Sequence, residues 1–352
     1  MPSISLCMIV KNEEKTLRRC LDSVKELVFE IIIVDTGSTD KTITICKEYT
    51  SSVYSHPWTN DFSEARNKSI SYATGDWILY MDADEMLSYD DINRVLKPLS
   101  DSQIIYSVQI QNLQPSLLDI NTGMDYFYQE RLFPNTKKYQ FIGDIYERLD
   151  PINQETKEST SFLPSLSIIH YDNDLDDRMR KGRRNLSMLL KTTSFVAKDD
   201  LYAYYLAFEL FRCNNYKESY EIINSAILNF INRSLLPPSK LYRLKYDILF
   251  TSKSISDIKD GLLRVIKLYP DYVDFHYYLG VYYFMNEEYS NAITSLSYCL
   301  LLGEYHPEYT IQKGTGTFLA ANLLGQCYEK QKNQKASDAS YRLTRATDSS
   351  IN

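Results

Sequence analysis

Hydrophobic residues form short continuous runs in the first half of the chain, and amphipathic segments separate these runs. The runs at Ser3–Val10, Glu30–Asp35 and Trp77–Asp82 have the length and the composition of buried strands. Between them, residues 12–27 and 61–74 place apolar side chains at helical spacing. This alternation of strands and helices predicts an α/β domain with a mainly parallel sheet that is covered by helices.

The second half of the chain has a different pattern. From about Asp176 onward, strand signals are almost absent, and aromatic and small residues recur at helical spacing. Three stretches resemble the paired helices of tetratricopeptide repeats: residues 204–227, 275–302 and 321–341. We therefore expect two domains, which are an α/β domain at residues 1–195 and an all-α tetratricopeptide-like domain at residues 196–352.

Tyrosine is dense in this second half, and two interpretations of it remain open. Most of these rings are expected to pack between helices. The alternative is that the repeats form a concave surface that binds a peptide or a second copy of the chain. On the second interpretation, the helical domain holds a protein acceptor or forms a homodimer.

The composition narrows the class of protein. The 352 residues are 44% hydrophobic and 24% charged, which is typical of a globular protein. The formal net charge of -7 argues against a nucleic-acid binder, because such proteins neutralise phosphates with basic residues. Lys11 and Glu13 interrupt the first apolar stretch, and no run reaches a membrane-spanning length, so we expect neither a signal peptide nor a transmembrane segment. The scattered cysteines form no CxxC motif, and we expect reduced thiols in a cytoplasmic protein.

An acidic cluster of Asp82, Asp84 and Glu85 directly follows the last of these buried runs. Such a cluster repels itself unless a positive charge lies on it. Glu13 and Asp35 also follow predicted strands, and ligands of open α/β sheets bind beyond the carboxyl ends of the strands. Because Asp82 and Asp84 are separated by one residue, extended geometry directs both carboxylates to the same side. Hard oxygen ligands in this arrangement suit Mg²⁺ or Mn²⁺.

The acidic cluster has several other possible interpretations. The simplest alternative is an acidic turn that caps the next helix, since a lone Asp-x-Asp motif occurs often by chance. An EF-hand is excluded, because the loop has neither the central glycine nor the terminal glutamate. A P-loop and a dinucleotide-binding Rossmann motif are excluded as well, because neither GxxxxGK[ST] nor GxGxxG after a strand occurs in the sequence.

The separated motifs become specific in combination. In order, the chain contains ISLCMIVKNEEKTLRRCLDSV, EIIIVDTGSTDKT and WTNDFSEARNKSISYATGDWILYMDADE. Together these blocks closely resemble family 2 glycosyltransferases of the GT-A fold, over roughly residues 3–190. The later segments QERLFPNTKKYQFIGDIYERL and IIHYDNDLDDRMRKGRRNLSMLL resemble further segments of that family. Tyr146 departs from the pattern, because it stands where relatives usually have histidine.

The resemblance implies a UDP-sugar donor, either UDP-glucose or UDP-N-acetylglucosamine. Asp35 would accept a hydrogen bond from the uracil ring, and Glu13 would lie near the base or the ribose. Arg66 would face the diphosphate, and the alternative for it is a surface ion pair. Asp82 would contact the ribose or the metal. The other residues of the expected donor site are Val10, Asp61, Ala83, Arg183 and Arg184, although a solvated helix face explains the last two almost as well.

The resemblance also implies a divalent cation, Mn²⁺ or Mg²⁺. Asp84 would bind this cation, with Asp82 and His170 as further ligands, and a core histidine with satisfied hydrogen bonds is an equal alternative for His170. Glu147 is the expected catalytic base and Asp144 the second candidate for that role. A single displacement at the anomeric carbon would invert its configuration.

The acceptor is predicted less directly. A transferase domain followed by helical repeats also resembles the build of peptide glycosyltransferases that modify bacteriocin precursors. On this basis we expect transfer to a Ser or Thr hydroxyl or a Cys thiol of a peptide or protein. The alternatives are a transferase that acts on a glycan or another small acceptor, and a non-catalytic repeat scaffold with a vestigial transferase domain.

Overall fold

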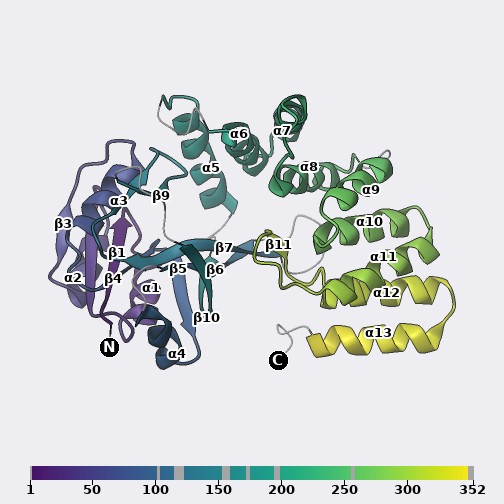
Figure 1. Ribbon diagram of the computed structural model, residues 1–352, viewed down its shortest axis with the longest axis horizontal. Coiled ribbons are helices and arrows are strands. Elements are labelled where there is room, and N and C mark those ends of the chain that lie inside the picture. Colours follow the sequence, from purple (N-terminus) through teal and green to yellow (C-terminus); the bar gives the residue numbers. More distant parts are fainter. Residues whose placement is uncertain are drawn as a thin grey trace. The chain divides into compact units, whose positions relative to one another are not determined.

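The computed structural model describes residues 2–100, 104–114, 123–152, 159–171, 175–193, 199–254 and 258–347. The chain forms two compact units, which Figure 1 colours along the sequence. The first unit contains Met1–Leu113 and Tyr128–Asn214, and the second contains Gln114–Phe127 and Asn215–Asn352. The predicted boundary between residues 195 and 196 lies outside the described residues, and the described residues 199–214 belong to the first unit.

A mixed sheet forms the centre of the first unit. Its parallel part has the order β3-β2-β1-β4, and the strands are β1 (Ile4–Val10), β2 (Glu30–Asp35), β3 (Val53–Ser55) and β4 (Trp77–Met81). The order continues with β7 (Gly123–Pro134), β6 (Ile104–Gln114), β10 (Ser159–Tyr171) and β5 (Glu85–Tyr89). The β4–β7 and β10–β5 pairs are antiparallel. The predicted parallel arrangement of the first strands is confirmed.

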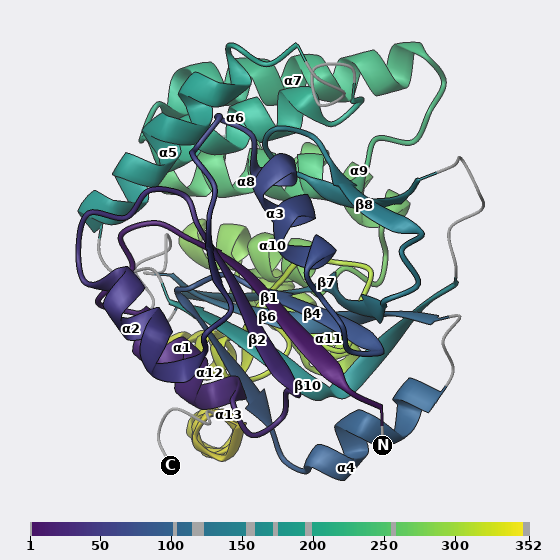
Figure 2. The same ribbon diagram turned by 90° about the vertical axis from the view of Figure 1, so that its left-hand side faces the viewer.

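Helices cover both faces of the parallel strands. The helices are α1 (Leu17–Val24), α2 (Thr42–Tyr49) and α3 (Phe62–Ser71). Figure 2 shows α3 on one side of the sheet and α1 with α2 on the other. Because both faces are covered, β1 and β4 are almost continuously buried rather than alternating between buried and exposed. The apolar face of α1 is Leu17, Cys20, Leu21 and Val24, as the helical spacing predicts.

One helix is shorter than its pattern predicts. The segment 12–27 shows helical spacing, but α1 begins only at Leu17. Asn12 has a positive φ of 58°, and its side-chain Oδ1 accepts a hydrogen bond of 2.8 Å from the Thr39 amide. The Glu13 amide donates to Thr42 Oγ1 over 2.7 Å. These contacts hold the segment that follows β1 against the loop that follows β2 and against the first residue of α2, so this segment cannot join α1.

The rest of the first unit surrounds the strand ends. A two-stranded hairpin pairs β8 (Tyr139–Ile142) with β9 (Arg148–Pro151). Gly143 and Tyr146 lie between these strands with positive φ values of 99° and 52°, so this connection turns sharply. The helical elements are α4 (Ile92–Leu96), the 3-10 helix η1 (Lys97–Ser100), α5 (Leu175–Leu189) and α6 (Tyr202–Arg212), and α5 packs on α6.

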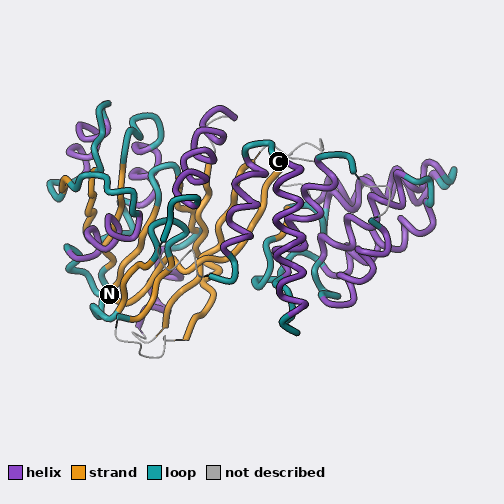
Figure 3. The backbone as a smooth tube through the Cα atoms, turned by 90° about the horizontal axis from the view of Figure 1, so that it is seen from above, coloured by secondary structure: helices purple, strands orange, loops and turns teal. Residues whose placement is uncertain are grey.

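The second unit is built mainly from helices, which are purple in Figure 3. They are α7 (Tyr216–Asn232), α8 (Ser239–Thr251), α9 (Lys259–Leu268), α10 (Val273–Met285), α11 (Tyr289–Leu302), α12 (Phe318–Lys330) and α13 (Gln334–Thr347). Consecutive helices pack on one another from α9 to α13. The short strand β11 (Ile311–Gln312) pairs with Asp125 and Tyr126 of β7. The expected tetratricopeptide-like array is confirmed.

Close helix contacts explain two glycines of the repeats. A Cβ atom at Gly280 would lie 2.8 Å from the Leu296 side chain, and one at Gly325 would lie 2.7 Å from Tyr341. Any larger residue would force α10 from α11, or α12 from α13. Tyr246, Tyr277 and Tyr278 are fully buried, so for these rings the packing interpretation is confirmed. Across the described residues, no helix is long and apolar enough to span a membrane.

Candidate active site

The parallel strands carry acids to one edge of the sheet. In the β1–β2 register Val10 lies beside Asp35, and in the β1–β4 register Met8 lies beside Met81, directly before Asp82. The Asp35 side chain is buried, and its carboxylate accepts hydrogen bonds from the amides of Gly37 (3.0 Å) and Ser38 (3.1 Å). The Val10 carbonyl accepts from the Thr36 amide over 2.9 Å. Asp35 therefore closes a tight turn at the end of β2.

Two arginines form ion pairs with the acidic cluster. Arg66 Nη2 donates to Asp82 Oδ1 over 2.8 Å, and Arg131 Nη2 donates to Glu85 Oε1 over 2.5 Å. Burial acts to raise the pKa of Asp82, but Arg66 and Arg131 outweigh it and the pKa is lowered. For Glu85, burial prevails over Arg131 and raises the pKa to about 7. Part of the positive charge that the acidic cluster requires is therefore supplied by the protein.

Asp84 is held by a lysine and a histidine. Lys181 Nζ lies 2.6 Å from Asp84 Oδ2, and His170 Nε2 lies 3.3 Å from the same oxygen. Lys181 Nζ also lies 3.1 Å from Asp177 Oδ2. Although burial opposes the charged form, the contacts with His170 and Lys181 place the pKa of Asp84 well below its usual range. Lys181 was not among the predicted site residues.

His170 has the environment of a metal ligand. Its Nδ1 lies 3.1 Å from Asn112 Oδ1, and the two residues are register partners on β10 and β6. Without a cation, Nε2 donates toward Asp84 Oδ2. If the ring proton moved to Nδ1 and was donated to Asn112 Oδ1, Nε2 would be able to coordinate a cation shared with Asp84, and such outer hydrogen bonds commonly fix a ligating imidazole. Asp84 and His170 therefore fit a divalent cation. Asp82, the third predicted ligand, contacts Arg66 through Oδ1.

Arg66 connects the acidic cluster with the β8–β9 connection. Its Nε donates to Glu147 Oε1 over 2.5 Å, while Nη2 binds Asp82. Its remaining nitrogen, Nη1, is buried and has no hydrogen-bond partner in the described part of the chain. A buried guanidinium nitrogen without an acceptor is costly, so this atom is suited to an anionic ligand. Of the predicted donor-site residues, Arg66 is the one that contacts both Asp82 and the predicted base.

The two predicted bases have different surroundings. Glu147 is paired with Arg66, whereas Asp144 Oδ1 accepts a hydrogen bond of 2.8 Å from Thr192 Oγ1. Between them, the Tyr146 hydroxyl donates to Glu209, which is fully buried on α6 and also accepts from Asn185 Nδ2 over 2.7 Å. Glu209 was not predicted, and its only signal was a single acid within the apolar stretch YYLAFELF.

The other predicted donor-site residues are less central. Asp61 is the N-cap of α3, because its carboxylate accepts from the Glu64 amide over 3.0 Å. Arg183 and Arg184 are exposed on α5, and the Arg184 guanidinium lies 5.2 Å from the centre of the Phe62 ring. Ala83 is buried within the acidic cluster.

Glu13 lies within the electrostatic reach of the acidic cluster. Thr16 Oγ1 donates to Glu13 Oε2 over 2.8 Å. Burial and the neighbouring Asp84 raise the pKa of Glu13 to about 7. Since it carries a proton for part of the time near neutral pH, Glu13 is able to donate a hydrogen bond as well as to accept one.

An α/β domain with acids at the strand ends, followed by repeat helices, is the architecture of a GT-A fold with a C-terminal tetratricopeptide-like domain. The chain belongs to the family described as glycosyl transferase family 2, whose model matches residues 5–147. It is 38% identical over 216 residues to an uncharacterized glycosyltransferase of Rickettsia conorii, a match that covers 55% of this chain and 76% of that relative.

Two further relatives are similar over larger or different parts of the chain. The SPbeta prophage-derived glycosyltransferase SunS of Bacillus subtilis is 29% identical over 233 residues, which are 65% of this chain and 54% of that relative. A TPR repeat-containing protein of Synechococcus elongatus is 35% identical over 188 residues, which are 52% of this chain and 45% of that relative. The chain thus spans about half the length of these two curated relatives.

Proposed function

We propose that the protein transfers a sugar from a UDP-sugar to a peptide or protein acceptor, with inversion at the anomeric carbon and with a divalent cation. The observation that carries this proposal is the sheet edge at which Asp35, Asp82 and Asp84 follow parallel strands, with Arg66 and Lys181 against the last two. Carboxylates are able to accept hydrogen bonds from the uracil base of such a donor and to bind the divalent cation that accompanies it. The two cationic side chains are able to bind the phosphates of the donor.

The base and ribose would be bound by the acids nearest to β1 and β2. Asp35 would accept the imide N–H of uracil, since a carboxylate has about four acceptor sites and two backbone amides already orient it. Glu13, whose pKa is about 7, would donate a hydrogen bond to a ribose hydroxyl while it is protonated.

Asp84 and His170 would hold the cation, while Asp82 would remain paired with Arg66. When bound, the cation would stabilise negative charge on the leaving diphosphate. Lys181 occupies the same oxygen of Asp84 that faces His170, so it would have to leave that oxygen. Its ammonium group would then be available to the diphosphate, together with the unpaired Nη1 of Arg66.

The transfer itself would be one displacement. The acceptor oxygen or sulfur would attack the anomeric carbon, and the bond from that carbon to the diphosphate oxygen would break, leaving the electron pair on UDP. Glu147 would take the acceptor proton on Oε2, because Arg66 holds Oε1. Asp144 remains the second candidate for this role.

The test is UDP release from a panel of UDP-sugars by the full chain, with synthetic peptides that contain Ser, Thr or Cys as acceptors and mass spectrometry of the products. We expect release that requires Mn²⁺ or Mg²⁺ and a peptide whose mass increases by one sugar. Asp90→Asn, at an exposed position, is the matched control for Asp84→Asn. Sugar transfer that persists in EDTA would contradict the role of the cation, and the absence of any UDP binding would contradict the donor.

A further inference from the structure

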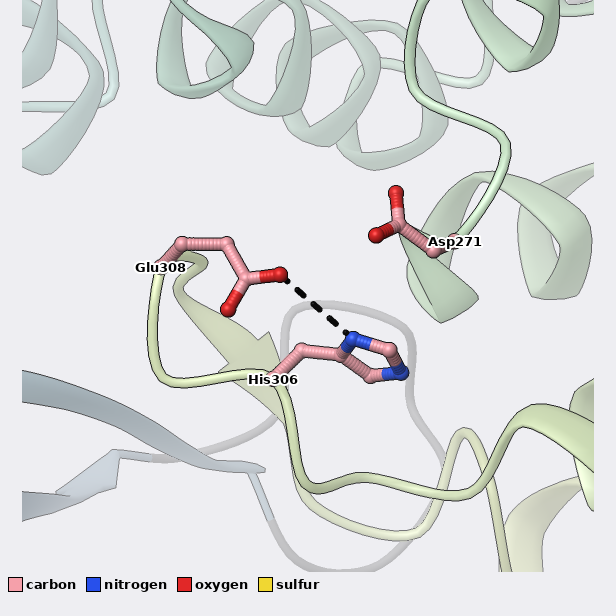
Figure 4. A group of neighbouring side chains, drawn as sticks. All are labelled: Asp271, His306 and Glu308. Carbon is pink, nitrogen blue, oxygen red and sulfur yellow. Dashed lines mark ion pairs between the residues drawn. The ribbon is translucent and has the colours of Figure 1, made fainter.

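A second group of metal-ligating side chains lies in the helical unit. Asp271 precedes α10, and His306 and Glu308 lie in the connection between α11 and β11. One ligand atom of each residue lies within 4.8 Å of the other two, and no other three His, Cys, Asp or Glu residues meet this condition in the described part of the chain. Figure 4 shows the Glu308 carboxylate facing the His306 ring, with Asp271 approaching from a different segment. The donor atoms thus come from two separate parts of the sequence.

The spacing of these atoms suits a shared cation better than a direct contact. His306 Nδ1 and Glu308 Oε1 are 3.6 Å apart, which exceeds a hydrogen-bond distance. Two ligands that each lie about 2.0–2.1 Å from a tetrahedral Zn²⁺ are separated by about 3.3 Å. Small side-chain rotations would therefore bring the two atoms onto one ion.

The segment is held in place by contacts that do not involve these ligand atoms of His306 and Glu308. Tyr309 OH donates to Asp271 Oδ1 over 2.8 Å, and the Tyr309 ring stacks on Tyr272 with 4.3 Å between centroids. The Tyr272 hydroxyl donates to the Thr310 carbonyl. A hydrogen-bond donor on a carboxylate ligand is a common feature of metal sites, because it orients the ligand before the ion arrives.

The two carboxylates of the group are not neutralised by lysine or arginine side chains among the described residues. Neither Asp271 nor Glu308 forms an ion pair with a lysine or an arginine of the described chain, and Glu308 Oε1 pairs with His306. A surface pair of His306 and Glu308 alone would contribute little to stability.

We propose that Asp271, His306 and Glu308 bind one divalent transition-metal ion of the Zn²⁺ type, with water in the remaining coordination positions. An imidazole nitrogen favours such an ion over Mg²⁺ and Ca²⁺, which prefer oxygen ligands throughout. The ion would join the connection between α11 and β11 to the residue that precedes α10. This site is distinct in its residues from the one described above, and the proposal does not rest on the function proposed for that site.

Titration of the reduced full chain with Co²⁺ tests the proposal, because the visible absorption of Co²⁺ distinguishes nitrogen and oxygen ligands from thiolates. Asp84→Asn serves as the background, since it removes the expected ion of the donor site. We expect one equivalent to bind with a nitrogen and oxygen spectrum and to be displaced by Zn²⁺. His306→Ala in that background should weaken binding by about tenfold or more.

Two further variants keep the test decisive. Glu308→Gln changes an exposed side chain, so it should leave the fold intact while weakening Co²⁺ binding and reducing the rise in melting temperature that Zn²⁺ produces. His56→Ala is the matched control, because His56 Nε2 lies 3.2 Å from Glu64 Oε1 without a third ligand. Identical titrations of the background, His306→Ala and Glu308→Gln would overturn the proposal, as would a thiolate spectrum.

Discussion

The molecule buries charge in two places, at the edge of the sheet and among the repeat helices. In the helical unit, Arg243 donates to Asp247 (3.0 Å), to Asp125 (3.2 Å) and to Asp274, and Nη1 also reaches the Thr310 carbonyl (3.1 Å). Every nitrogen of this guanidinium has an acceptor. At the sheet edge, Arg66 is buried to a similar degree, with 6% exposure against 7% for Arg243, but its Nη1 lacks a partner in the described chain.

The carboxylates differ in how their contacts are distributed. Asp274 accepts from Arg243, from Thr315 Oγ1 (2.6 Å) and from the Gln312 amide (3.0 Å), and it is fully buried. The contacts of Asp84 with Lys181 and His170 both lie on one oxygen, Oδ2. Burial of charge alone therefore does not identify a binding site. The informative difference is whether the protein itself satisfies the buried atoms, because unsatisfied ones are those that a ligand is able to complete.

The cluster of Arg243 with Asp125, Asp247 and Asp274, called the closed cluster here, should contribute most to the stability of the fold. Arg243→Met would leave Asp247, Asp274 and Asp125 without their shared cation, and loss of one partner from a buried ion cluster costs about 3–5 kcal/mol. We expect a loss of this size in the free energy of unfolding, measured by urea denaturation followed by circular dichroism. Arg264→Met, at an exposed position of α9, should change it by less than about 0.5 kcal/mol. Equal effects of the two substitutions would contradict the comparison.

The cluster of Asp82, Asp84, Arg66 and Lys181 at the sheet edge, called the open cluster here, should contribute most to activity. Asp84→Asn removes the charge that would bind the cation, and we expect the rate of UDP release to fall by about 10²–10³-fold. The melting temperature should also fall, because contacts with His170 and Lys181 stabilise the charged form of Asp84 in the folded protein, but Lys181 keeps Asp177 as a partner. Rates of transfer and thermal melting are measured on the same preparations. A variant that retains more than a tenth of the rate would show that Asp84 is not part of the catalytic machinery.

The acids at the strand ends could be predicted because local pattern fixes them. A buried run predicts a strand, parallel strands end at one edge, and the residue that follows the run must therefore lie at that edge. Asp35 ends β2 and Asp82 follows β4, so both satisfy this chain of reasoning. The extended geometry expected between Asp82 and Asp84 is wrong, because residues 83–84 form a turn in which the Glu85 amide donates to the Asp82 carbonyl over 3.1 Å. The side chain at the end of each such strand is determined by a few neighbouring residues, so the sequence contains enough information to place it.

The positions of the lysine and arginine side chains that contact these acids could not be predicted by the same reasoning. Lys181 reaches Asp84 across 97 positions of sequence, and Arg66 reaches Glu147 across 81. Nothing local distinguishes Lys181 from Arg183 or Arg184 on the same helix, and the packing of α5 decides which of them faces the acids. The start of α1 at Leu17 has a similar cause, because Asn12 and Glu13 contact a loop that is distant in sequence.

The pH dependence of stability offers a smaller test of the closed cluster. Burial raises the pKa of Asp274 to about 7, although Arg243 opposes this effect. An unfolded Asp titrates near about 3.9, so between these values the folded chain holds a proton that the unfolded chain releases. The contribution of this group is therefore complete at low pH and is lost as the pH rises toward 7.

Asp274→Asn removes this titration, and the variant is compared with the wild type by urea denaturation at pH 5.5 and 7.5. The wild-type advantage in the free energy of unfolding should shrink by about 1–2 kcal/mol between these pH values. Because other groups titrate identically in both proteins, only the difference is interpreted. An advantage that stays constant or grows would mean that Asp274 is ionised in the folded protein throughout this range.

The smallest expected effect concerns Lys181, which occupies the position that a cation would take on Asp84. Without the donor, its ammonium group and the metal compete for Asp84 Oδ2, so Lys181→Met should strengthen Mn²⁺ binding by about fivefold, near the lower end of typical coupling between ligands. With Mn²⁺ present, the same substitution removes a charge that would face the diphosphate, and UDP binding should weaken by a similar factor.

Electron paramagnetic resonance of free Mn²⁺ measures the affinity for the metal, and calorimetry with UDP measures the affinity for the nucleotide. Lys191→Met, an equal change of charge at an exposed position after α5, should alter neither. Opposite signs for metal and nucleotide are the distinctive result, since a merely structural lysine would weaken both together, and that outcome would leave Arg66 as the cation expected to bind the diphosphate.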